Sequence, residues 1–215
     1  NIGDFICSAF NEKPYNFKFS AAHKTTEQVA DLYASNFGIK EGCNARQLTA
    51  FTKNTLRKDI YQPEALVTGA NFLVSNTGTI VLTENEGNIL KSSTYTPIHI
   101  IVAGIDKMIS SMDELGVLLP LSSLYDSNNN VSSLYTFVNK PLTNNGEVQK
   151  LYLILLNNNR TNILSKDKQR NILSCIQCGA CLEVCPIYNT VGGHTYDEYN
   201  PGPVGSISLP LLKDI

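Results

Sequence analysis

Hydrophobic residues along the first 165 positions recur at helical spacing in some segments and at strand spacing in others. Apolar side chains from Ile2 to Phe10 predict an amphipathic helix at the start of the chain. The capping-box sequence Thr25-Thr26-Glu27-Gln28 predicts where a second helix begins, and Gly38 predicts where it ends. A third helix is expected from Asn44 to about Ile60, because Pro63 lies just beyond it.

Short runs rich in β-branched and aromatic residues predict strands. One is Tyr15–Ser20, in which apolar and polar residues partly alternate. The turn sequence Asn76-Thr77-Gly78 predicts a tight hairpin in which Gly supplies the positive φ. The apolar run Ile98–Ala103 predicts a strand buried on both faces. Further predicted elements are strands at 71–75, 79–83, 134–139 and 148–156, a helix at 112–119 and a polar loop at 122–133. This alternation of helices and strands indicates an α/β fold with a mixed sheet.

The composition of the chain changes after residue 165. A short helix is predicted from Lys166 to Ser174, and a cysteine-rich stretch follows it. The tail beyond is rich in Gly and Pro, a composition that packs poorly by itself. We therefore expect two domains, an α/β domain at 1–165 and a small cysteine-bearing segment at 166–215.

Four of the six cysteines fall in one run, Cys175-Ile-Gln-Cys178-Gly-Ala-Cys181-Leu-Glu-Val-Cys185-Pro186. The spacing C-x2-C-x2-C-x3-C-P is that of bacterial ferredoxins and predicts ligands for a [4Fe–4S] cluster. Small residues between the cysteines would let the backbone approach the cluster. Four apolar residues would exclude water from it: Ile176, Leu182, Val184 and Ile187.

Other uses of these cysteines fit less well. Structural zinc prefers two C-x2-C pairs separated by a long loop, whereas this run is compact. Disulfides require an oxidising compartment, which nothing else in the chain indicates. Cys7 and Cys43 lie outside the run and are expected to be small buried hydrophobic residues.

Composition and charge exclude several classes of protein. Apolar residues make up 42% of the chain, so global disorder is excluded. The net charge of −2 gives no basic surface for nucleic acid. No apolar run approaches the ~20 residues that span a bilayer, and no signal-peptide pattern opens the chain. We expect a cytoplasmic protein without a membrane span.

The cysteine run and several other motifs together resemble the lactate-utilisation protein B family, iron–sulfur proteins that carry a LUD domain. The resemblance extends from about Gly3 to Leu212. Its motifs are Ala22-His23-Lys24-Thr25, Thr68-Gly69-Ala70-Asn71-Phe72, Asn76-Thr77-Gly78-Thr79-Ile80-Val81-Leu82, Asn85-Glu86-Gly87-Asn88, Pro97-Ile98-His99-Ile100, Gly192-Gly193-His194-x-Tyr196 and Pro201-Gly202-Pro203-x-Gly205. One departure is Asn159, which stands before Arg160 where we expect Gly.

The resemblance implies a fold, cofactors and partners. The fold would be an α/β sandwich similar to the ribose-phosphate isomerase, sugar-phosphate deaminase and CoA-transferase group. Family members are about twice as long and bear a second cysteine run, so we expect this chain to be a piece of a protein that holds two [4Fe–4S] clusters. In two-cluster ferredoxins the cysteine before Pro ligates the other cluster. We therefore expect this chain, handled in air, to be mostly free of cluster. The implied partners are the other lactate-utilisation subunits.

Polar loops of the α/β domain offer a second candidate site. In the similar CoA-transferase fold a Glu at a strand end is the nucleophile, and Glu84, Glu86 and Asn88 follow a predicted strand. Backbone amides at Thr68-Gly69-Ala70-Asn71 and at Thr77-Gly78-Thr79 offer a candidate cradle for an anion. These segments also have the composition of plain turns, with two solvated acids in the first.

The three histidines leave structural and functional readings open. His99, inside an apolar strand, is expected to be a hydrogen-bonded core residue. His23-Lys24 would bind a carboxylate or cap a helix, and His194 would pack near the cluster. No histidine forms a catalytic triad pattern.

Three functions are therefore considered. The first is an iron–sulfur electron-transfer component, itself non-catalytic, of a system that oxidises L-lactate to pyruvate. The second is an enzyme of acyl or sugar-phosphate chemistry at Glu84–Asn88 with structural clusters, which rests on fold likeness alone. The third is an assembly scaffold. The sequence contains no dinucleotide or P-loop motif.

Overall fold

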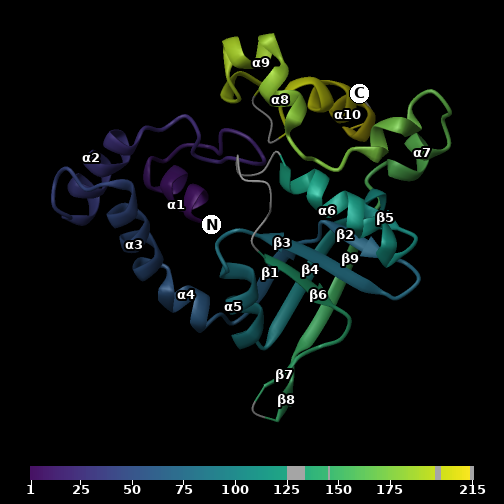
Figure 1. Cartoon of the computed structure of the whole chain (residues 1–215), viewed down its shortest axis with the longest axis horizontal. Coiled ribbons are helices and arrows are strands. Elements are labelled where there is room, and N and C mark those ends of the chain that lie inside the picture. Colours follow the sequence, from purple (N-terminus) through teal and green to yellow (C-terminus); the bar gives the residue numbers. More distant parts are fainter. Residues whose placement is uncertain (125–133, 145, 197–199, 214–215) are drawn as a thin grey trace. The chain divides into compact units, whose positions relative to one another are not determined.

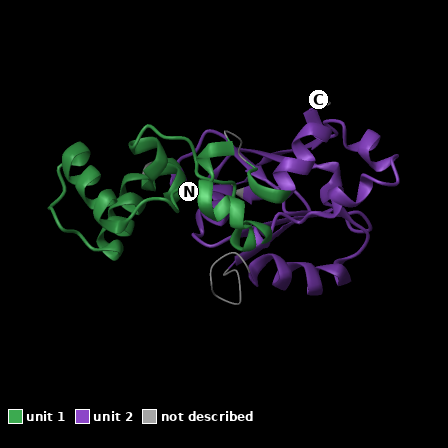
Figure 2. Cartoon of the chain, turned by 90° about the horizontal axis from the view of Figure 1, so that it is seen from above, with its two compact units in different colours: residues 1–59, 181–203 green, residues 60–180, 204–215 purple. Residues whose placement is uncertain are grey.

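The computed structural model describes residues 1–124, 134–144, 146–196 and 200–213 (Figure 1). The chain divides into two compact units (Figure 2). Unit 1 comprises residues 1–59 and 181–203, and unit 2 comprises residues 60–180 and 204–215. These divisions fall at other places than the predicted domain boundary between residues 165 and 166, which stays a prediction.

Unit 1 is helical and its first core surrounds Tyr33. Its longer helices are α1 (Ile2–Ala9), α2 (Thr26–Phe37) and α3 (Ala45–Thr55). Helices α2 and α3 contribute the buried residues Val29, Ala30, Tyr33 and Leu48, and partly buried residues of α1 pack against them. The Tyr33 ring packs edge-on against Phe5, with ring centroids 6.0 Å apart. Its hydroxyl lies 2.8 Å from Thr52 Oγ1, so the one polar atom of this buried ring is hydrogen-bonded.

The helix ends predicted for this region are confirmed. Thr25 and Gln28 form a capping box at the start of α2, and Gly38 ends the helix with a φ of 67°. Asn44 forms a capping box with Gln47 at the start of α3. The third predicted helix is interrupted at Leu56, and the next helix, α4 (Arg57–Tyr61), continues from there into unit 2.

The strand predicted at Tyr15–Ser20 is wrong. The side chain of Asn16 accepts hydrogen bonds from the amides of Lys18 at 2.8 Å and Phe19 at 2.6 Å, which closes a turn. An Asn side chain that bonds the backbone two residues ahead competes with extended pairing. The alternation of apolar residues in this segment therefore does not mark a strand.

The later part of unit 1 holds short elements. They are α8 (Ala180–Val184, whose first residue belongs to unit 2), α9 (Pro186–Val191) and η4 (His194–Tyr196). Gly193 makes a close backbone approach here, because a Cβ at this position would lie 1.9 Å from the carbonyl oxygen of Tyr15. Only a residue without a side chain fits this position without a shift.

Unit 2 is built on a parallel sheet and a mixed sheet. The parallel sheet has the order β1 (Leu66–Gly69), β4 (Ile98–Gly104), β9 (Lys150–Leu156). The mixed sheet has the order β5 (Met108–Ile109), β2 (Phe72–Val74), β3 (Thr79–Glu84), β6 (Leu134–Val138). A small hairpin joins β7 (Thr143–Asn144) to β8 (Glu147–Val148). Short helical elements complete the unit: α5 (Asn88–Tyr95), η1 (Ile105–Lys107), η2 (Met112–Glu114), α6 (Leu115–Leu124), α7 (Arg160–Leu164), η3 (Arg170–Ser174) and most of α10 (Gly202–Lys213).

The predicted α/β class and mixed sheet are confirmed, with differences of detail. The hairpin of β2 and β3 turns at Gly78, whose φ is 67°. Strand β4 is not buried on both faces: His99, Ile101 and Ala103 are buried, while the residues between them are half-buried. The helix predicted at 112–119 begins as the 3-10 turn η2 and extends to Leu124. Residues 125–133 of the predicted loop lie outside the described residues.

Strand β9 leaves an apolar surface exposed. Among the described strands it pairs with β4 alone, so it forms an edge of the parallel sheet. Five consecutive apolar residues of this strand, Tyr152 to Leu156, are each between 43% and 53% exposed. In the described part of the chain, no helix is long and apolar enough to cross a membrane.

Candidate functional site

The first two cysteines of the run lie in unit 2, after η3. The backbone turns sharply on either side of Cys178, with φ values of 59° at Gln177 and 82° at Gly179. The amide of Gln177 points to the sulfur of Cys175, at 3.4 Å. Backbone amides directed at cysteine sulfur stabilise a thiolate and tune a metal that it binds. Ile176 packs against the cluster of buried residues that contains Phe72, so the run is anchored to the sheet.

The last two cysteines lie in unit 1. Cys181 is in α8, and Cys185 is the N-cap of α9, with its sulfur 3.5 Å from the amide of Tyr188. Pro186 occupies the first turn of α9, where it loses no hydrogen bond. All four cysteines of the run are half-buried, and none forms a disulfide within the described part of the chain. This donor set, with amides directed at two of the sulfurs, fits the ligation of iron by thiolate.

The four residues predicted to exclude water from a cluster differ in their burial. Leu182 is buried and Ile176 is half-buried, whereas Val184 is 80% exposed and Ile187 is 65% exposed. The short helices α8 and α9 turn these two side chains to solvent, a direction that the spacing in the sequence does not reveal. Neither Val184 nor Ile187 therefore contributes to a shield within unit 1.

A group of charged residues in unit 2 was missed by sequence reasoning. Lys107 donates a hydrogen bond from Nζ to the carbonyl oxygen of Cys175, at 3.4 Å. Burial lowers the pKa of Lys107. Next to it, Asp106 forms an ion pair with Arg160. Asn159 takes a φ of 64°, so it adopts the left-handed conformation for which Gly was expected. Asn159, in place of the expected Gly, was the one feature of the sequence that drew attention to this group of charged residues.

The structure gives Glu84 a role within the fold. It is buried, and its carboxylate oxygens accept hydrogen bonds from the amides of Ile89 and Leu90, both at 2.7 Å. Glu84 therefore caps the N-terminus of α5, where a negative charge is favourable. The expectation of two solvated acids is wrong for this residue, and both oxygens that a nucleophile would use are engaged.

The other residues of the predicted ligand loops also bond within the chain. Asn88 Nδ2 donates to Glu86 at 3.3 Å, and Asn71 Oδ1 accepts from the amide of Thr83 at 2.9 Å. Thr68 Oγ1 lies 2.9 Å from Nε2 of buried His99, and burial lowers the pKa of that imidazole. His99 is thus the hydrogen-bonded core residue that the sequence predicted. Gly69 is exposed. These contacts favour the turn interpretation of both loops, and their use as ligand sites stays a prediction.

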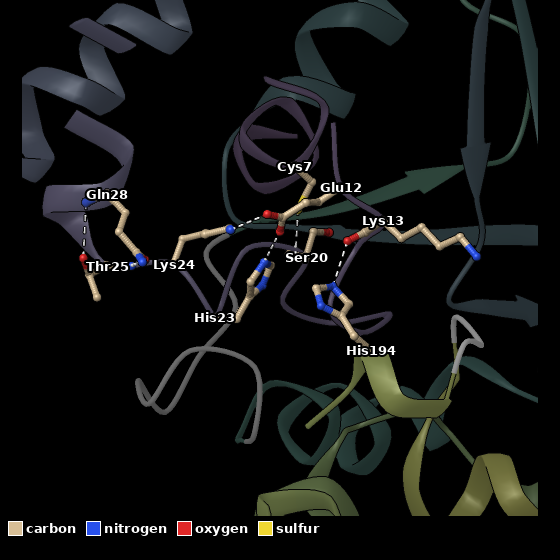
Figure 3. Close-up of polar contacts among 9 residues, drawn as sticks. All are labelled: Cys7, Glu12, Lys13, Ser20, His23, Lys24, Thr25, Gln28 and His194. Atoms are coloured by element: carbon tan, nitrogen blue, oxygen red, sulfur yellow. Dashed lines mark hydrogen bonds and ion pairs between the residues drawn. The ribbon is translucent and has the colours of Figure 1, made fainter. Parts of the chain in front are cut away.

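The other two histidines lie together in unit 1 (Figure 3). His23 Nε2 is 2.7 Å from Glu12 Oε2, and Lys24 Nζ is 2.5 Å from the other oxygen of Glu12. His194 Nε2 is 3.0 Å from the carbonyl oxygen of Lys13. The hydrogen bonds from Lys24 and His23 lower the pKa of Glu12. The sequence places these residues far apart, so only the fold brings them together.

Comparisons with known proteins place these observations in a family. The model of the LUD domain family matches residues 5–151. The chain is 34% identical to "Lactate utilization protein B" of Bacillus cytotoxicus and 32% identical to the protein of that name from Shouchella clausii. Each alignment covers 99% of this chain and 45% of the relative, so the chain spans about half the length of these relatives. A crystal structure of a DUF162 family protein from Deinococcus radiodurans is similar with 14% identity and a TM-score of 0.34, over 72% of this chain and 93% of that one.

Proposed function

Because the chain belongs to the LUD domain family, we propose that it is the iron–sulfur, electron-transferring part of a protein of L-lactate oxidation. Relatives over its whole length are named for lactate utilisation. The observation that carries the electron-transfer role is the run of four cysteines at ferredoxin spacing, from Cys175 to Cys185.

The ligand roles are assigned from the spacing of the cysteines. Cys175, Cys178 and Cys181 ligate one [4Fe–4S] cluster, and Cys185 ligates a second cluster. A second cysteine run, which the resemblance to the family implies, would complete both ligand sets. A bound cluster supplies one-electron transfer. Oxidation of lactate to pyruvate releases two electrons and two protons, so a partner that handles lactate passes the electrons on singly.

The residues around the run hold and tune the ligands. The amides of Gln177 and Tyr188 donate toward the sulfurs of Cys175 and Cys185, and such outer contacts orient and tune metal ligands. Lys107 fixes the backbone of Cys175 to the end of β4, since η1 follows that strand directly. The α/β domain thereby orients the first ligand.

Anaerobic reconstitution followed by iron and sulfide counts and EPR tests the proposal. The full-length protein should hold about eight irons, and Cys175→Ser, Cys178→Ser or Cys181→Ser should each remove about four of them. Cys43→Ser is the matched control, because Cys43 lies outside the run, and it should leave the counts unchanged. The circular dichroism of all variants should match that of the unmodified protein. One zinc without labile sulfide would refute the electron-transfer role.

A further inference from the structure

We propose that His23 and His194, supported by Glu12, form a second metal site in unit 1, for a divalent ion of the zinc class. One candidate ligand atom from each of the three residues lies within 4.8 Å of the others. The three side chains therefore gather at one place in unit 1.

The two imidazoles are brought together by packing that does not depend on a metal. Their ring centroids are 4.6 Å apart at an interplanar angle of 72°. Tyr15 holds both, stacked on His23 at 5.1 Å and edge-on to His194 at 5.3 Å. Figure 3 shows the two rings beside each other, on segments far apart in the sequence. The two imidazoles are thus held close together without a metal.

The hydrogen bonds of His194 select the tautomer that a metal ligand needs. A carbonyl oxygen only accepts, so Nε2 of His194 donates its hydrogen to Lys13. The lone pair of His194 is then on Nδ1. Histidines that ligate metals commonly donate their other N–H to a backbone carbonyl or a carboxylate in this way.

His23 shows the corresponding arrangement with a carboxylate. Its Nε2 lies 2.7 Å from Glu12 Oε2, and its Nδ1 is buried without a hydrogen-bond partner among the described residues. A buried nitrogen lone pair is unfavourable unless a hydrogen-bond donor or a metal ion interacts with it. Donation from Nε2 to Glu12 places that lone pair on Nδ1, where a metal ion would satisfy it.

Glu12 acts in this site as a positioning residue. Its Oε1 forms an ion pair with Lys24, whose ammonium group also lies 4.2 Å from the centre of the Phe10 ring. Because both carboxylate oxygens are engaged, Glu12 orients His23 and offsets part of the charge of the ion. Water completes the coordination, since His194 is exposed.

Borderline transition ions suit this donor set better than hard cations. Imidazole nitrogen favours Zn²⁺, Ni²⁺ and Cu²⁺, whereas Mg²⁺ and Ca²⁺ prefer oxygen ligands. The site is chemically distinct from the thiolates of the cysteine run. Its occupation would tie the segment around Glu12 to the segment that follows α9.

Zinc binding to the 215-residue chain tests the inference, with X-ray absorption to separate the two donor sets. Zinc at the histidines should show nitrogen and oxygen neighbours at ~2.0–2.1 Å, whereas zinc at the cysteines shows sulfur at ~2.3 Å. His194→Gln should remove the nitrogen-bound zinc and leave the sulfur-bound zinc. Glu12→Gln should retain the site with an affinity about 10–100-fold weaker, as for other residues that orient a ligand.

Two controls keep the result interpretable. Glu41→Gln removes an exposed carboxylate of the same unit and should change nothing. In the unmodified chain, zinc should shift the NMR signals of the His23 and His194 rings and leave those of buried His99 in place. Zinc bound through sulfur alone, or equal nitrogen-bound zinc in His194→Gln and the unmodified chain, would overturn the inference.

Discussion

Replacing Glu84 tests whether this carboxylate is a structural cap of α5. The amide of Leu90 donates to Glu84 Oε1 at 2.7 Å, and the amide of Ile89 donates to Oε2 at the same distance. Asn88 Oδ1 offers Ile89 a second acceptor at 2.9 Å. Leu90 is therefore the sharper reporter of what the carboxylate contributes.

The expected magnitude follows from these two bonds. Hydrogen bonds to a charged group contribute about 1.5–3 kcal/mol each, and loss of a helix cap costs about 0.5–2 kcal/mol. Removal of the buried charge recovers its desolvation, and Asn88 keeps one bond to Ile89. We expect Glu84→Ala to destabilise the start of α5 by about 2 kcal/mol. Glu84→Gln keeps one carbonyl acceptor and should lose about half of that.

Amide hydrogen exchange measured residue by residue is the appropriate assay. A loss of 2 kcal/mol corresponds to exchange about thirtyfold faster at Leu90, with a smaller change at Ile89. Glu64→Gln is the control, because it removes an exposed carboxylate of the same unit. Unchanged exchange at Leu90 in Glu84→Ala would refute the cap and return Glu84 to the list of candidate nucleophiles.

Two further predictions concern the packing of unit 1. Gly193→Ala should lower the midpoint of urea unfolding by the equivalent of about 1–3 kcal/mol, because its Cβ would lie 1.9 Å from the carbonyl oxygen of Tyr15. Gly116→Ala is the control and should not destabilise the protein, since nothing lies within 4 Å of a Cβ at that position. Equal midpoints for the two variants would contradict the close approach. Tyr33→Phe should lose about 1 kcal/mol with the bond to Thr52. Burial raises the pKa of Tyr33 above its ordinary value of 10.0, so its contribution is complete below pH 10 and decreases as the pH rises further. The stability of Tyr33→Phe, measured by urea unfolding between pH 8 and 11, should therefore fall less steeply, and parallel curves would contradict this.

Features set by neighbours in sequence could be predicted, and features set by distant contacts could not. The caps at Thr25 and Asn44 and the turn at Gly78 depend on residues within four positions, and each was found where the pattern indicated. The strand at Tyr15–Ser20 was wrong because one side chain, Asn16, outweighs the local alternation.

The candidate sites divide in the same way. The cysteine run can be recognised as a candidate cluster site from its spacing alone. The contact of Lys107 with Cys175, in contrast, depends on how the segment after β4 packs against the segment after η3. The pairing of His23 with His194 joins residues 171 positions apart. No local periodicity carries such information, so the three-dimensional structure was needed to find it.

The exposed edge strand β9 has a practical consequence for every measurement made per chain. An uncovered strand with apolar side chains on both faces is a template for pairing with another molecule, and it favours aggregation when nothing protects it. Purified samples of this chain should therefore increase in hydrodynamic size with concentration. Light scattering should precede metal counting, because thiols enclosed in an aggregate bind less metal than those of dispersed molecules. Lys or Glu in place of Ile154, at the middle of the exposed run, should keep the sample monodisperse.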